Sequence, residues 1–162
     1  MLFVAGLVAC GFQLRGSWTF PFDSIYIDLP PYSEFGAQLK RTIEGTQAAR
    51  LADSASAAQA VFAPAGESRE RKILSYNSAG RVREVQLRYR YSFRIQDNKG
   101  KDLMPVSTIE LTRDLTYDDS QTLAKEQEEE ILWRDMLNDL TQQIMRRLGA
   151  KTQAPLGSER KP

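Results

Sequence analysis

VQLRYRYSFRIQ, residues 85–96, is the stretch that decides the fold. Apolar or aromatic residues occupy every odd position of this stretch, and polar residues occupy every even position. Successive side chains of a strand point to opposite faces, so the alternation predicts a β-strand with one buried face and one wet face. The wet face is cationic, because it carries Arg88, Arg90 and Arg94.

Turn signals stand on both sides of this strand. Residues 77–80 (NSAG) precede it and residues 97–100 (DNKG) follow it, and both quartets end in glycine. We expect an earlier strand over residues 59–76, with a bulge near Gly66, and a returning strand over residues 106–117. The middle of the chain therefore predicts an antiparallel meander.

A strand, a helix and a brief strand precede the meander. Residues 24–29 are rich in β-forming side chains, and residues 49–52 have the composition of a brief further strand. Between them Ser33 is a good helix N-cap, and Gly45 is expected to end the helix. The apolar stripe of this helix recurs at every fourth position and comprises Phe35, Leu39 and Ile43.

A longer helix is expected to follow the meander, from near Ser120 to Gly149. Glutamates gather near its start and arginines near its end, as the helix dipole favours. Apolar residues recur at helical spacing and define one face. The face comprises Ile131, Leu132, Met136, Leu137, Leu140, Ile144, Met145 and Leu148.

These elements together predict an α+β sandwich. The expected sheet has roughly four strands, mostly in a meander, and two helices pack on one of its faces. We expect one domain over residues 10–149 and a disordered tail over residues 150–162, which is polar and contains proline and glycine.

Composition excludes several kinds of chemistry. The 162 residues include no histidine and one cysteine, and the formal net charge is +1. Without histidine there is no Ser-His-Asp or Cys-His catalysis and no histidine metal site. One thiol makes neither an internal disulfide nor a cysteine-only metal site. We therefore expect no enzyme and no metal, and the balanced charge gives no reason to expect binding to nucleic acid.

The single cysteine, Cys10, follows a short apolar run over residues 2–9. Eight residues match the apolar core of a signal peptide and are too few to span a bilayer. The run ends in Leu7-Val8-Ala9-Cys10, which resembles the lipobox of bacterial lipoproteins. In a lipobox the thiol receives a diacylglyceryl group, and the signal is then cut before the cysteine.

We therefore interpret residues 1–9 as part of a lipoprotein signal peptide and Cys10 as a lipid attachment site. No cofactor is expected besides this covalent lipid. In lipoproteins, an aspartate directly after the lipidated cysteine favours retention in the inner membrane. This chain has Gly11 at that position, so the resemblance to lipoproteins implies sorting to the outer membrane. The competing interpretation of the apolar run is an ordinary N-terminal strand.

From Cys10 onward the chain resembles the LptE family, small lipoproteins of the outer-membrane lipopolysaccharide (LPS) translocon. The resemblance begins with CGFQLR at residues 10–15 and continues through the order of strand, helix, meander and helix. It also includes MPVS at residues 104–107, LAK at residues 123–125 and IMRRL at residues 144–148.

The resemblance implies a non-enzymatic subunit that plugs the LptD β-barrel, helps to assemble it and binds LPS during insertion into the outer leaflet. The implied partners are an LptD-like barrel in a heterodimer, LPS, and outer-membrane lipid through the anchor. The implied place is the outer membrane, facing the periplasm and inside the barrel lumen. The alternative is a stand-alone periplasmic lipid-carrier or transport-auxiliary lipoprotein, which would need an enclosed apolar cavity.

Basic residues are the candidates for contact with LPS. By the resemblance, Lys125 matches a basic family position implicated in LPS contact. A second basic position has no clean match, and Arg81 and Arg83, just beyond the expected turn, would substitute for it. Guanidinium groups form paired, charge-assisted bonds to phosphate, so the arginines of the long strand are also candidates. These are Arg88, Arg90 and Arg94.

Each candidate also has a purely structural interpretation. Glu110 and Asp114 on the returning strand share the polar face with the strand arginines and would pair with them. Lys125 would pair with Glu128 or Glu129 on its own helix. Three aromatic residues near the start also have two interpretations. They are expected either to anchor the chain to a barrel wall or lipid interface, or to form an arm that folds onto its own domain. They are Trp18, Phe20 and Phe22.

Overall fold

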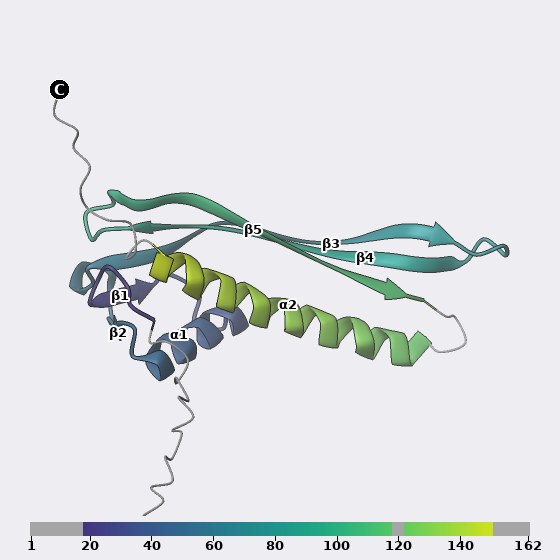
Figure 1. The fold of residues 1–162 in the computed structure, drawn as a ribbon, viewed down its shortest axis with the longest axis horizontal. Coiled ribbons are helices and arrows are strands. Elements are labelled where there is room, and N and C mark those ends of the chain that lie inside the picture. Colours follow the sequence, from purple (N-terminus) through teal and green to yellow (C-terminus); the bar gives the residue numbers. More distant parts are fainter. Residues whose placement is uncertain (1–17, 118–121, 151–162) are drawn as a thin grey trace, which may run out of the picture.

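The computed structural model describes residues 18–117 and 122–150. These residues form a five-stranded sheet in the order β2-β1-β3-β4-β5, and Figure 1 shows both long helices on the same face of it. The α+β prediction is confirmed, with one strand more than the four expected. The elements are β1 (Ser24–Ile27), α1 (Glu34–Thr46), β2 (Arg50–Leu51), a short 3-10 helix (Ala55–Ala57), β3 (Ala60–Tyr76), β4 (Val82–Gln96), β5 (Asp102–Thr116) and α2 (Thr122–Ala150).

The alternating stretch lies in β4, between the two other long strands of the sheet. β4 pairs antiparallel with β3 on one side and with β5 on the other. Its six apolar and aromatic side chains face the helices and are at most 1% exposed. This confirms that the stretch has one buried face and one outer, polar face.

β3 changes its surroundings halfway along its 17 residues. Only its start pairs with β1, in a parallel ladder that joins Ile25 to Ala60 and Ile27 to Phe62. Pro64 follows, and the register against β4 shifts between Pro64 and Gly66, which confirms the expected bulge. Proline has no N–H to donate to a ladder and is tolerated at a sheet edge. Because the rest of β3 pairs with β4 alone, it is an edge of the sheet.

The two meander turns use the same local chemistry. Asn77 Oδ1 accepts hydrogen bonds from the N–H groups of Ala79 (3.0 Å) and Arg81 (2.9 Å). Asp97 Oδ1 accepts the equivalent bonds from Lys99 (2.8 Å) and Lys101 (2.9 Å). Each turn ends in a glycine with positive φ, +74° at residue 80 and +84° at residue 100, where a Cβ would be strained. The backbone bonds to Asp97 lower its pKa below the ordinary aspartate value.

Helix α1 begins as expected and ends differently. The Ser33 hydroxyl accepts a hydrogen bond from the Gly36 N–H at 3.0 Å, which confirms the N-cap. The prediction that Gly45 ends the helix is wrong, because α1 continues to Thr46. The residue that turns left-handed is Gln47, with φ of 53°, and its N–H donates to the Glu44 carbonyl at 3.2 Å.

Helix α2 buries only its second half. Among the α2 side chains that the structure describes, the buried ones lie between Met136 and Leu148, whereas Ile131, expected on the apolar face, is 53% exposed. The prediction that Gly149 ends this helix is also wrong, because α2 runs to Ala150. A Cβ on Gly149 would lie 3.4 Å from the Trp18 ring, so this glycine permits close packing. The expected start at Ser120 lies outside the described residues.

The aromatic residues near the start of the described chain fold onto their own domain. Phe20 and Phe22 are 6% and 8% exposed, and their ring centroids are 5.4 Å apart. Trp18 packs against the core beside Gly149. The structure thus selects the structural interpretation of this arm over an anchor for a wall or a lipid interface.

Candidate functional site

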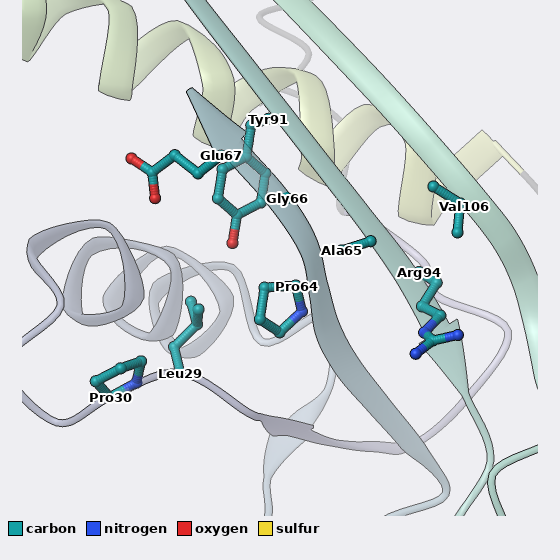
Figure 2. Close-up of a pocket in the computed structure, with 9 residues that line it drawn as sticks. All are labelled: Leu29, Pro30, Pro64, Ala65, Gly66, Glu67, Tyr91, Arg94 and Val106. Atoms are coloured by element: carbon teal, nitrogen blue, oxygen red, sulfur yellow. The ribbon is translucent and has the colours of Figure 1, made fainter. Parts of the chain in front are cut away.

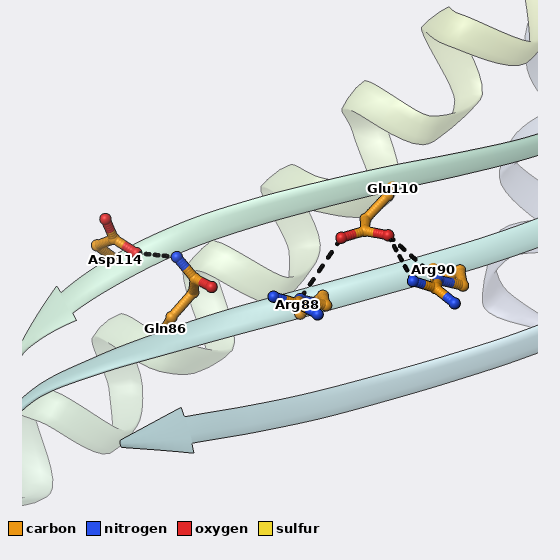
Figure 3. Close-up of polar contacts among 5 residues, drawn as sticks. All are labelled: Gln86, Arg88, Arg90, Glu110 and Asp114. Carbon is orange, nitrogen blue, oxygen red and sulfur yellow. Dashed lines mark hydrogen bonds and ion pairs between the residues drawn. The ribbon is translucent and has the colours of Figure 1, made fainter. Parts of the chain in front are cut away.

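The outer face of the sheet carries the strand arginines, and two of them share one acid. Glu110 on β5 pairs with Arg88 at 3.5 Å and with Arg90 at 2.8 Å (Figure 3). The other expected acid, Asp114, accepts a hydrogen bond from Gln86 at 3.0 Å. Glu110 therefore offsets part of the positive charge of the cationic face predicted from the alternation.

Arg94 lies apart from this network, beside a notch of about 730 Å³ (Figure 2). Among the described residues we find no ion pair to Arg94, and its buried Nε has no hydrogen-bond partner. The buried Tyr91 hydroxyl, on the other side of β3 in Figure 2, also has no partner within the described chain, and burial raises its pKa. The notch is lined by Leu29, Pro30, Pro64, Ala65, Gly66, Glu67, Tyr91, Arg94 and Val106.

The other candidates gather at one end of the molecule, which we call the distal end. It comprises the β3–β4 turn, the end of β5 and the first turns of α2 (Figure 1). Arg81 and Arg83 are exposed there. Lys125 lies on α2 at the same end and pairs with Glu128 at 2.8 Å, with 19% of its side chain exposed. This pair is one of the two that the helical spacing predicted.

Apolar side chains are exposed at the same end. Leu74 and Tyr76 near the tip of β3 are 45% and 60% exposed, and Leu123 on α2 is 71% exposed. Large exposed apolar side chains close to cations suit a ligand that has both anionic groups and hydrocarbon. The distal end thus combines the two chemistries that an anionic lipid would need.

A polar and aromatic cluster joins the edge of β3 to α2, and its members are not among the site residues predicted from the sequence. We call it the clasp, and its α2 members are Glu129 and Trp133. Arg71 Nε donates to Glu129 at 3.3 Å, and the Trp133 indole N–H donates to the same carboxylate at 3.4 Å. The remaining members are Glu67, Arg69, Tyr89 and Tyr117.

Arg69 lies between aromatic rings within the clasp. Its guanidinium is 4.9 Å from the Tyr89 ring centroid and 5.8 Å from that of Trp133, distances typical of cation–π contacts. Tyr89 donates its hydroxyl to Glu67 at 3.0 Å, and burial followed by this carboxylate raises its pKa. One feature of the sequence pointed to the clasp. Residues 67, 69 and 71 of β3 are charged, although they pair with apolar or aromatic residues on the buried face of β4.

Neither α1 nor α2, as far as the described residues extend, combines the length and hydropathy of a membrane-crossing helix.

Solved structures with this fold define its class, which is that of small bacterial lipoproteins. The chain is 39% identical to an uncharacterized lipoprotein B from Nitrosomonas europaea, with a TM-score of 0.76 over 89% of this chain and 94% of that one. A minor lipoprotein from Acinetobacter baumannii is 25% identical, with a TM-score of 0.68 over 82% and 95%. The rare lipoprotein B from Shewanella oneidensis has the same fold at 22% identity, with a TM-score of 0.69 over 80% and 96%.

The family is equally clear. A protein-family model described as "LptE: Lipopolysaccharide-assembly" matches residues 22–148, and the chain belongs to this family. The comparison with curated proteins found no match. Family membership confirms the resemblance over residues 22–148, whereas its start at residues 10–15 lies outside the matched range and the described residues.

Proposed function

We propose that this chain is a non-enzymatic outer-membrane lipoprotein that plugs an LptD-like LPS-translocon barrel, helps to assemble it and binds LPS. The observation that carries the proposal is the match of residues 22–148 to the LPS-assembly family. A role in LPS assembly follows from that membership, and the barrel partner and the direct contact with LPS are our extension of it.

The polar outer face of the sheet supports the plug. Its cross-strand pairs, such as Arg90 with Glu110 and Ser92 with Thr108 at 2.8 Å, leave hydrogen-bonding groups facing away from the helices. A barrel lumen is lined by polar side chains, so such a face would be compatible with it. We therefore place this face against the lumen wall.

The distal end supports the contact with LPS. LPS carries phosphates and acyl chains, and this end combines Arg81, Arg83 and Lys125 with the exposed Leu74, Tyr76 and Leu123. We place the phosphates on the cations and the nearest hydrocarbon on the apolar side chains. Arg88 and Arg90, which pair with Glu110 on the outer face of the sheet, are weaker candidates because they lie outside the distal end.

A stand-alone lipid carrier is the less favoured function. A carrier would hold its lipid between the helices and the sheet, and aromatic side chains occupy that space. The Phe35 ring centroid is 4.9 Å from that of Tyr91 and 6.2 Å from that of Phe62. Rings at these distances pack as in an ordinary protein core.

The anchor is proposed on Cys10, which lies outside the described residues. Thioether-linked diacylglycerol with a further acyl chain would hold the protein to the membrane, because several chains together give firm anchoring. Labelling with radioactive palmitate should be lost in Cys10→Ala. Labelling that persists in this variant would refute the assignment.

Co-purification tests the plug. An affinity-tagged LptD-like barrel from the same organism should retain this chain in a stoichiometric complex, and depletion of the chain should leave the barrel misassembled. A chain that stays monomeric while the barrel folds and purifies normally would exclude the plug and would favour the carrier.

A matched pair of double variants tests the LPS site. Arg81→Gln with Arg83→Gln should weaken binding to LPS aggregates about tenfold or more, because each charge-assisted bond contributes about 1.5–3 kcal/mol. Arg88→Gln with Arg90→Gln makes the same change in net charge on the outer face and should have a smaller effect. Equal losses in the two variants would contradict the distal site.

A further inference from the structure

The first half of α2 lacks the apolar anchorage of the second half. Between Thr122 and Trp133 the partly buried apolar residues that reach the core are Leu132 and Trp133, whereas full burial begins at Met136. Helix α1 packs beside the second half, where Gln38 donates to Asn138 at 2.6 Å (Figure 1). Burial of its own apolar side chains therefore fixes the second half of α2 more firmly than the half that carries Lys125, whose attachment depends more on other interactions.

The clasp supplies those interactions. Glu129 is its centre, because this single carboxylate accepts from Arg71 of β3 and from Trp133 one turn further along α2. The Trp133 ring also meets the Tyr89 ring edge-on, with centroids 6.4 Å apart. The clasp thus ties the exposed edge of the sheet to the half of α2 that has few apolar contacts.

The clasp also reaches the end of β5. The Arg71 guanidinium lies 5.2 Å from the Tyr117 ring centroid, so one side chain contacts both Glu129 and the strand end that precedes α2. Arg71 and Glu129 are 39% and 21% exposed at the side chain, so water screens their pair only in part. Three elements that border the distal end therefore meet at Arg71.

We propose that Arg71 and Glu129 are positioning residues for LPS: they hold the first turn of α2 so that Lys125 faces the same ligand as Arg81 and Arg83. This inference rests on the proposed LPS binding at the distal end. Lys125 lies one helical turn before Glu129. A shift of the first turn of α2 would therefore move the Lys125 ammonium group away from Arg81 and Arg83.

Two neighbouring substitutions on α2 separate position from charge. Glu129→Gln breaks the clasp, whereas Glu130→Gln breaks only the exposed pair with Arg134, at 3.2 Å. Both remove one negative charge, which by itself would strengthen binding to anionic LPS. We expect Glu129→Gln to weaken binding about fivefold relative to Glu130→Gln, the fold-change of a coupling of about 1 kcal/mol.

The exchanged pair Arg71→Glu with Glu129→Arg keeps the net charge and can re-form the ion pair. It should recover part of the affinity that Glu129→Gln loses. Far-UV circular dichroism should be unchanged in all variants, and amide hydrogen exchange over residues 122–133 should accelerate in Glu129→Gln alone.

The outcomes are distinct. If Glu129→Gln and Glu130→Gln bind LPS equally, or exchange amides equally over residues 122–133, the positioning role is refuted. If the unaltered full-length chain does not bind LPS aggregates, the proposed LPS site fails, and the positioning role for LPS fails with it. Accelerated exchange without any change in LPS affinity would leave the clasp as a structural contact only and would also overturn the inference.

Discussion

At the residue scale, Gln47 is a site of backbone strain. It adopts φ of 53° at the end of α1, a left-handed conformation that costs a residue with a Cβ about 1 kcal/mol or more. Glycine adopts this conformation freely, although it also gains entropy in the unfolded chain. The position is therefore one where a glycine substitution should stabilise the fold.

We predict that Gln47→Gly raises the free energy of unfolding by about 0.5–1 kcal/mol. Urea denaturation followed by circular dichroism measures it. Gly45→Ala is the control, because Gly45 is helical and a Cβ there would meet nothing within 4 Å; it should stabilise through helix propensity alone. A decrease in stability for Gln47→Gly would contradict the strain.

The glycines of the helices show what sequence can and cannot predict at this scale. The N-cap at Ser33 was predictable, because its hydroxyl needs only the backbone N–H of the residue three positions further on. Gly45 and Gly149 were read as helix ends, and both are helical. Glycine favours a helix end without requiring it, and the reason for Gly149, the Trp18 ring beside it, is a contact distant in the sequence.

At the element scale, α2 is divided into a buried and an exposed half. Leu140 is fully buried and Leu123 is 71% exposed, although both are leucines on one helix. We predict that Leu140→Ala lowers the free energy of unfolding by about 2–5 kcal/mol through lost contacts and a cavity. Leu123→Ala should change it by about 0.5 kcal/mol or less. Chemical denaturation of the two variants checks both values, and similar losses would contradict the division.

A strand was predictable from the sequence where its side chains alternate regularly between a buried face and an exposed face. β4 is covered on one face along its whole length, so its alternation was clear. Three inner positions of β3 beyond Pro64 are charged and belong to the clasp (Glu67, Arg69 and Arg71), so the alternation is broken in that half. β5 begins at Asp102, four residues before the expected start, with Pro105 tolerated at the sheet edge. The brief strand expected over residues 49–52 is confirmed as β2 at Arg50–Leu51, although its two residues carry no alternation.

At the scale of the whole molecule, two kinds of force hold its two ends. The end near α1 is fixed by buried apolar and aromatic side chains from both helices, whereas at the distal end the clasp adds charged and cation–π contacts to a smaller set of buried side chains that includes Val85 and Leu115. Charge pairs are screened by salt, whereas apolar burial is not weakened by it. The two ends should therefore respond differently to ionic strength.

We predict that about 1 M sodium chloride accelerates amide exchange over residues 122–133 and leaves residues 136–148 unchanged, because the Debye length falls to about 3 Å. Hydrogen exchange followed by mass spectrometry measures both segments in one experiment. Equal responses along α2 would indicate that apolar contacts, and not the clasp, hold its first half.

The candidate site was predictable in its residue types and not in its arrangement. Cross-strand parity predicted Glu110 and Asp114 as partners for the strand arginines, and Glu110 is confirmed; helical spacing predicted Glu128 or Glu129 for Lys125, and Glu128 is confirmed. The distal end brings together residues from β3, the β3–β4 turn and α2, which only the folded sheet places at one end. Arg71 and Glu129 are separated by 58 positions, a distance that no local pattern bridges.

Of the two matched turns at the ends of β4, the one closed by Asp97 responds to acid and the one closed by Asn77 does not. The lowered pKa of Asp97 means that its carboxylate adds stability above the ordinary aspartate pKa of about 4, and this is lost as the pH falls through the lowered value. Asn77 makes the same two bonds with an uncharged amide oxygen, which does not titrate. Acidification should therefore loosen the turn that faces away from the distal end, and Asp97→Asn should remove that loosening in amide exchange of residues 98–101. The end proposed to meet LPS keeps its turn intact at any pH at which the sheet survives.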